Sequence, residues 1–218
     1  MLITDYLFEN VKPIWDAYLE HDFIMDMGNG NLCKDKFKDY LIQDYLYLKE
    51  YAKVYALVKC ENIEQMKFCQ NSINGILEDE SATHIWYLKN FGEKIEELED
   101  YKIKEANENY TSYMKSIALT GDLLDTMVSV LPCAWSYYYI GKKLKETYKE
   151  NLEDNFYKSW IESYSCEGYE QVARTSIEFV NTLSENIDEN KKEKLKDIFI
   201  KASIHEMKFW DMAYEEVK

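Results

Sequence analysis

Apolar residues recur every three or four positions along most of the chain, which is the spacing of an amphipathic α-helix. Residues 4–20 show it with Leu7, Val11 and Tyr18, and Pro13 is expected to bend this helix. A turn is expected at 28–31 (Gly-Asn-Gly-Asn), because Gly and Asn tolerate positive φ. Charged stretches connect the further helices, which are predicted at residues 34–60, 63–91, 104–119, 122–148, 152–164, 168–184 and 189–216.

The scarcity of turn residues supports a helical fold. Only seven glycines and two prolines occur in 218 residues, too few for the tight turns of a many-stranded β fold. A hydrophobic content of 46% can fill one sizeable core, and no internal repeat or linker divides the sequence. We therefore predict an all-α protein, a single compact helical bundle that forms one domain over residues 1–218.

Acidic residues interrupt the apolar stripes of three predicted helices. Asp44 occupies one step of the stripe in the helix at 34–60, and Glu206 completes the stripe of the last helix. In the helix at 63–91 the apolar face leads to Glu80 and then His84. A buried carboxylate costs several kcal/mol unless it is paired or hydrogen-bonded. Each acid by itself is explained by a structural role in which its carboxylate is hydrogen-bonded to a neighbouring group. The three acids together favour a polar pocket.

Cys133 is the strongest candidate nucleophile among five cysteines. It follows Pro132 inside a predicted helix, where proline removes a backbone hydrogen bond and bends the chain, and such a bend can open a pocket. Tyr137 lies one turn further on. A lone buried cysteine is more often a small core residue, and this is the interpretation of Cys60 and Cys69.

Tyrosine is unusually frequent, with nineteen residues. Most of these rings are expected to be core aromatics whose hydroxyls reach the surface. A few hydroxyls on apolar faces could instead line a cavity for a flat heteroaromatic ligand, with rings that stack on it. The candidates are Tyr47, Tyr110, Tyr137 and Tyr164.

Charge and targeting signals exclude several classes of function. The formal net charge of −15 repels phosphate backbones and anionic membrane surfaces, so neither nucleic acid nor a membrane is an expected partner. The N-terminus lacks the basic start of a secretory signal, and the cysteines form no CxxC pair, so a cytoplasmic location is expected. The three histidines lie far apart in the sequence, and we predict no metal and no cofactor.

Several motifs, in this order, resemble those of the TenA family of thiaminase II enzymes over nearly the whole chain. They begin with Gly-Asn-Gly-Asn-Leu at 28–32 and Tyr-Leu-Ile-Gln-Asp at 40–44. Leu-Pro-Cys-Ala-Trp follows at 131–135, and Glu206 precedes Phe-Trp at 209–210. This resemblance implies a heme-oxygenase-like helical fold and a homotetramer.

The same resemblance implies residue roles. Cys133 corresponds to the family's nucleophile, Glu206 to its acid/base, and Asp44 to the carboxylate that binds the pyrimidine's amino group and adjacent ring nitrogen. Glu80 and His84 also match, as a possible outer layer of the site. Residues around the pyrimidine ring correspond to Tyr47, Tyr110, Tyr137, Tyr164 and Phe209.

The implied activity is that of an aminopyrimidine aminohydrolase in thiamin salvage. It would hydrolyse 4-amino-5-aminomethyl-2-methylpyrimidine, or thiamin, to the hydroxymethylpyrimidine through a cysteine adduct. A non-catalytic module that binds a pyrimidine or regulates a partner is the alternative, and it should tolerate serine in place of Cys133. A di-iron bundle needs Glu-x-x-His pairs, which the sequence lacks, and no histidine stands out as a heme ligand.

Overall fold

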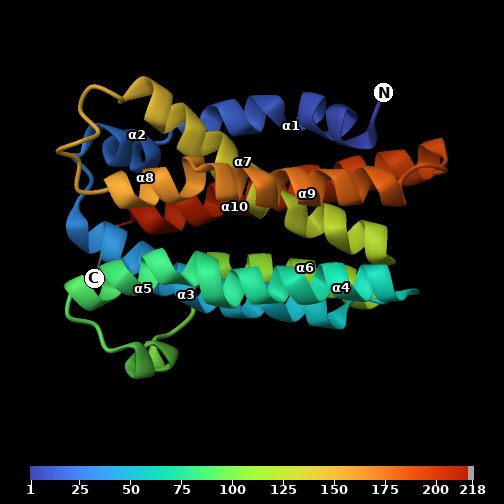
Figure 1. Ribbon diagram of the computed structural model, residues 1–218, viewed down its shortest axis with the longest axis horizontal. Helices are drawn as coiled ribbons and strands as arrows, with labels where there is room; N and C mark the ends of the chain where they lie inside the picture. The colour runs from blue at the N-terminus through green and yellow to red at the C-terminus, as the bar shows by residue number, and fades with distance from the viewer. Residues whose placement is uncertain (216–218) are drawn as a thin grey trace. The chain divides into compact units, whose positions relative to one another are not determined.

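The structure, a computed structural model, describes residues 1–215, except for the side chains of residues 79–81. Helices joined by short connections make up this part of the chain, and no strand occurs in it (Figure 1). The prediction of an all-α protein is confirmed. Within the same residues, none of the helices combines the length and the apolar character that a membrane span requires.

Contacts within the chain group it into two units, each described here by itself. The first unit comprises Met1–Leu32 and Met127–Asp211, and the second comprises Cys33–Thr126 and the residues from Met212 onward. Helix α7 (Leu123–Thr147) begins in the second unit and helix α10 (Glu189–Tyr214) ends in it.

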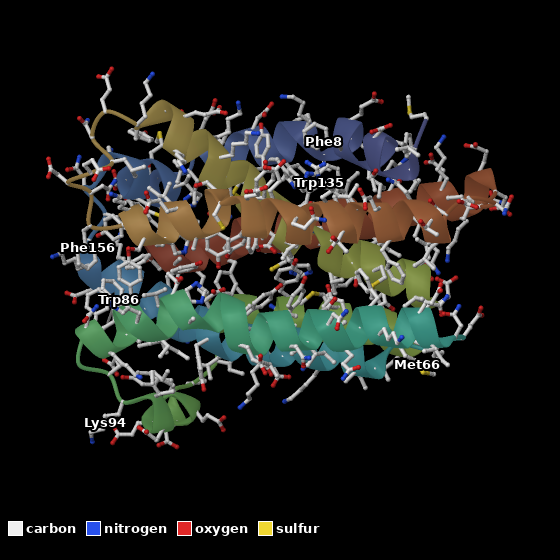
Figure 2. All side chains as sticks on the ribbon, in the orientation of Figure 1. Phe8, Met66, Trp86, Lys94, Trp135 and Phe156 are labelled. Carbon is white, nitrogen blue, oxygen red and sulfur yellow. The ribbon has the colours of Figure 1, made fainter. Side chains whose placement is uncertain are left out.

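The first unit is built around aromatic side chains of its long helices. It contains most of α7 and α10, and its other helices are α1 (Ile3–Leu19), α2 (Asp22–Asn29), α8 (Lys158–Ser165) and α9 (Glu167–Leu183). Phe8 of α1 stacks on Trp135 of α7 with ring centroids 5.4 Å apart (Figure 2). Trp15 meets the same indole edge-on at 5.3 Å. These rings join α1 to α7, with Trp15 fully buried and Phe8 and Trp135 half-buried.

The second unit is organised around α3 (Lys34–Leu57), which contacts three other helices alongside it (Figure 1). These helices are α4 (Ile63–Asn74), α5 (Ser81–Asn90) and α6 (Glu105–Thr120). A π-helical segment, η1 (Gly75–Glu80), joins α4 to α5, and a 3₁₀ segment, η2 (Ile95–Asp100), precedes α6. The buried amide of Gln43 donates to the carbonyl of Lys102 at 3.0 Å and accepts from the Lys104 N–H at 2.9 Å. It therefore fastens the start of α6 to α3.

Two predicted helix boundaries are wrong. The helix predicted at 34–60 ends at Leu57, and the one predicted at 152–164 begins at Lys158. In the latter case Asn155 is responsible, because its side chain accepts from the Tyr157 N–H and donates to the carbonyls of Met27 and Gly28. An Asn side chain that bonds backbone groups in this way competes with helix formation.

The turn expected at residues 28–31 is only partly confirmed. Gly30 has φ of +82° and forms the C-cap of α2, as the turn chemistry predicts. Gly28 instead lies inside α2, where a Cβ atom would come within 2.3 Å of the Tyr148 ring. Gly28 is therefore required for close packing and not for its φ angle.

Gly141 offers a test of how closely α7 and α8 approach. A Cβ atom at Gly141 would lie 2.9 Å from the carbonyl carbon of Tyr164, a backbone atom that cannot rotate away. Gly141→Ala should therefore lower the free energy of unfolding by about 1–3 kcal/mol despite the better helix propensity of alanine. Urea denaturation measures this change.

The control for this variant is Gly75→Ala. Gly75 is helical, with φ −58° and ψ −42°, and nothing lies within 4 Å of an added Cβ. This substitution should raise the free energy of unfolding by about 0.5–1 kcal/mol. Equal effects of the two substitutions would contradict the close approach.

Candidate active site

Cys133 lies in the most buried stretch of α7. Its side chain is 3% exposed, and Pro132 before it has no N–H to donate to the carbonyl of Val128 one turn earlier. Two hydroxyls are fully buried one turn away on the same helix, at Ser129 and Ser136. The Ser136 Oγ has no hydrogen-bond partner among the described residues, so it can bond to a bound molecule. The thiol thus lies one helical turn from two buried hydroxyls, in an otherwise apolar stretch of α7.

Glu206 is buried in α10, in the same unit as Cys133. It is 2% exposed, as the apolar stripe predicted. One turn earlier, Ser203 is held from α1 at two points: its Oγ accepts from Trp15 Nε1 at 3.1 Å and its carbonyl accepts from the Tyr18 hydroxyl at 2.5 Å. These bonds fix the turn of α10 that precedes the carboxylate.

The Tyr18 hydroxyl also experiences the charge of Glu206. Burial and then the negative charge of Glu206 raise the pKa of Tyr18 well above its usual value. Tyr18 therefore remains a protonated donor to Ser203. Tyr18 is not among the predicted site residues, although its place on the apolar stripe of the first helix indicates that it faces inward.

Aromatic rings from three helices of the first unit gather around Tyr137. Its ring centroid lies 4.9 Å from that of Tyr164 on α8 and 5.1 Å from that of Trp210 on α10. Trp160 completes the group, 4.6 Å from Tyr164. Phe209, next to Trp210, is 2% exposed. The structure thus brings together Tyr137 and Tyr164, two of the residues predicted to line a pyrimidine site.

In the second unit, Asp44 of α3 faces His84 of α5. Both side chains are almost fully buried, and Asp44 Oδ2 lies 3.2 Å from His84 Nδ1. Burial lowers the pKa of His84 to about 4, so the imidazole is neutral at physiological pH. Asp44 therefore lies beside a polar but uncharged ring.

Two further predicted residues, Tyr47 and Tyr110, meet in the same unit. Their ring centroids are 5.3 Å apart, and Tyr51 also stacks on Tyr47, at 5.5 Å. The Tyr47 hydroxyl lies 3.9 Å from the sulfur of Met114. The predicted site residue Glu80 has a side chain outside the described part of the structure.

The buried imidazole makes stability depend on pH. His84 has a pKa of about 4 when folded and about 6.5 when unfolded, so the unfolded chain takes up a proton first. The free energy of unfolding should therefore fall as pH decreases from about 6.5 to about 4, by roughly 3 kcal/mol from this group.

His84→Asn should reduce that dependence. Urea denaturation at several pH values gives the slope of the free energy of unfolding against pH, both for the native protein and for the variant. The slope is informative even if the variant is less stable at every pH. Identical slopes would contradict a neutral, buried His84.

Curated relatives match this chain along its entire length. The aminopyrimidine aminohydrolase of Helicobacter pylori is 37% identical over 217 residues, which cover 99% of this chain and 100% of that protein. The aminopyrimidine aminohydrolase of Halalkalibacterium halodurans is 38% identical over 213 residues, 96% of this chain and 94% of that protein.

Solved structures and a family model agree with these relatives. A TenA homologue from P. horikoshii OT3 superposes with a TM-score of 0.86 at 26% identity, covering 98% of this chain and 99% of that one. A Shewanella denitrificans domain with a heme oxygenase-like fold superposes with a TM-score of 0.73 at 16% identity, over 97% and 91% of the two chains. The predicted heme-oxygenase-like fold is thus confirmed. Because the family model matches residues 8–216, this chain belongs to the TENA/THI-4/PQQC family.

Proposed function

We propose that this protein is an aminopyrimidine aminohydrolase of the thiaminase II type that acts in thiamin salvage. The observation that carries the proposal is that one structural unit contains both a buried thiol, Cys133, and a buried carboxylate, Glu206. A thiol and a carboxylate are the nucleophile and the proton carrier that this hydrolysis needs. The full-length relatives named aminopyrimidine aminohydrolase support it.

The reaction replaces an amine on the methylene at pyrimidine carbon 5 by hydroxide. Direct displacement is slow, so the Cys133 thiolate adds to the ring carbon beside that position while Glu206 protonates the ring nitrogen. Electrons then flow outward and expel ammonia from the aminomethyl group, which reacts in its protonated, ammonium form. Water adds to the exocyclic methylene, its proton is lost, and departure of the thiolate restores the aromatic ring with the hydroxymethyl group in place.

Asp44 is assigned to substrate binding. Its carboxylate accepts from the amino group of the pyrimidine and so fixes the ring orientation. A neutral His84 lies beside it, with Nδ1 3.2 Å from Asp44 Oδ2, and adds no positive charge that would compete with a cationic or donor group of the substrate. His84, and with it Glu80, is therefore proposed as the outer layer that supports Asp44.

Aromatic side chains are proposed to hold the pyrimidine ring. The ring of Tyr47 lies against that of Tyr110, and the ring of Tyr137 lies against that of Tyr164. Such rings stack on a flat heteroaromatic ligand while their hydroxyls bond its nitrogens. Phe209 supplies a purely apolar surface.

The proposed substrate is 4-amino-5-aminomethyl-2-methylpyrimidine, with thiamin as a second possibility in which the thiazole is the leaving group. Salvage of degraded thiamin is favoured, because making thiamin only to cut it would be wasteful. A cytoplasmic homotetramer is part of the same proposal, and light scattering tests the tetramer. The net charge of −15 argues against nucleic acid or an anionic membrane as a partner.

Cys133→Ser tests the covalent mechanism. Serine is a far weaker nucleophile without a dedicated base, so ammonia release from the aminomethylpyrimidine should fall by at least about a thousandfold. Cys33→Ser changes an exposed cysteine at the start of α3 and should retain native turnover. Circular dichroism confirms equal folding. Native activity in Cys133→Ser, or no turnover of either substrate by the native protein, would favour the binding-module alternative.

Glu206→Gln and Asp44→Asn separate proton transfer from binding. Loss of the proton carrier in Glu206→Gln should lower kcat by about 10²- to 10⁴-fold. Asp44→Asn leaves an amide that can still accept one hydrogen bond but lacks the charge, so KM should rise markedly more than in Glu206→Gln. Steady-state kinetics measures both constants. A Glu206→Gln variant changed only in KM would contradict its assignment as acid/base.

A further inference from the structure

Two cysteines that the proposed reaction does not use face each other in the second unit. Cys69 lies on α4, and Cys60 lies in the five-residue connection between α3 and α4. Their sulfur atoms are 3.7 Å apart. The interpretation of both as small core residues is confirmed for Cys69, which is 5% exposed, but wrong for Cys60, which is only half-buried and outside any helix.

A surface groove gives access to this pair. It has a volume of about 450 Å³ and lies between the end of α3 and α4. Its lining includes both cysteines and Met66, which projects from α4 (Figure 2). Lys59, Gln70 and Asn74 add an ammonium group and two amides. These polar groups can hydrogen-bond to the carboxylates and amides of a small peptide.

The two thiols differ in their environments. Burial, a hydrogen bond with Cys60 and the charge that Cys60 would carry raise the pKa of Cys69 to about 12, so Cys69 is a protonated thiol. Cys60 is the more exposed sulfur and is the one that a reagent in the groove meets first. A neutral, shielded thiol next to an accessible one is the arrangement in which the second sulfur resolves a modification of the first.

The surrounding contacts hold Cys60 close to Cys69. Lys59 donates to the carbonyl of Leu119 at 3.3 Å, and the Glu61 N–H donates to the Gln65 side chain at 2.7 Å. The connection is thus anchored on both sides of Cys60, while the residue itself is in no helix. A disulfide has an S–S length of about 2.05 Å, so the two sulfurs need to approach by less than roughly 2 Å, which side-chain rotation can provide.

We propose that Cys60 and Cys69 form a reversible dithiol–disulfide site that is oxidised by a low-mass peptide disulfide bound in this groove. The Cys60 thiolate attacks one sulfur of the disulfide, forms a mixed disulfide and releases one thiolate. The Cys69 sulfur then attacks Cys60, loses its proton and releases the second thiolate. One disulfide is reduced to two thiols, and the two cysteines are oxidised to one disulfide.

Formation of the mixed disulfide at Cys60 makes the attack by Cys69 easier. Once Cys60 is in a mixed disulfide it can no longer carry a negative charge, so one of the causes that raise the pKa of Cys69 is removed. Deprotonation of Cys69 is then easier than in the reduced pair. The first step therefore promotes the second.

Oxidised glutathione serves as the probe. The full chain, with Cys33→Ser and Cys166→Ser to remove the exposed cysteines, is incubated with it, alkylated and digested without reduction. Trypsin cuts after Lys59 and Lys67, so Cys60 and Cys69 fall in separate peptides, 60–67 and 68–89. Mass spectrometry should find these two peptides cross-linked in most chains, and dithiothreitol should release them.

Single variants in the same background identify the order of events. With Cys69→Ser, oxidation should stop at one glutathione on the 60–67 peptide. With Cys60→Ser, Cys69 should remain unmodified. The proposal is overturned if both cysteines of the parent chain are recovered alkylated, or if Cys69 is glutathionylated in the Cys60→Ser variant. Because the readout is a covalent bond, it is independent of whether the protein hydrolyses aminopyrimidines.

Discussion

The cost of keeping carboxylates inside an apolar helical interior is the constraint on which the candidate site depends. Asp44 and Glu206 are each only 2% exposed. An ion so placed costs several kcal/mol, comparable with the 5–15 kcal/mol of a whole domain's stability, unless neighbouring groups offset it. The fold therefore has to supply polar neighbours for both acids. Without these neighbours, the cost of burying the carboxylates would not be offset.

Each unit meets this requirement differently. In the second unit a neutral imidazole, His84, lies against Asp44, and burial removes the contact of this carboxylate with water. In the first unit two α1 side chains, Trp15 and Tyr18, hold the turn of α10 before Glu206. Dry surroundings strengthen the interaction of either carboxylate with a polar ligand, since the effective dielectric constant is lower than in water. Burial, which makes the two carboxylates costly to accommodate, therefore also strengthens their interaction with a polar ligand.

Local periodicity explains which parts of this structure could be predicted. The spacing of apolar residues predicts most helices, and it places Asp44 and Glu206 on inward faces, because burial of a helix face depends only on residues three and four apart. Long-range contacts explain the failures. The late start of α8 depends on Asn155 bonding to carbonyls of residues 27 and 28, and the role of Gly28 depends on the Tyr148 ring. No local pattern contains such pairs.

The two buried cysteines show why burial alone does not identify a nucleophile. Cys133 and Cys69 are nearly equally buried, at 3% and 5% exposure. Cys69 has another thiol beside it, which together with burial raises its pKa to about 12 and keeps it protonated. Cys133 instead shares its unit with a buried carboxylate, Glu206, and follows a proline that frees a backbone carbonyl. Since both residues are the same chemical group at similar depth, any difference in their reactivity has to come from such surroundings.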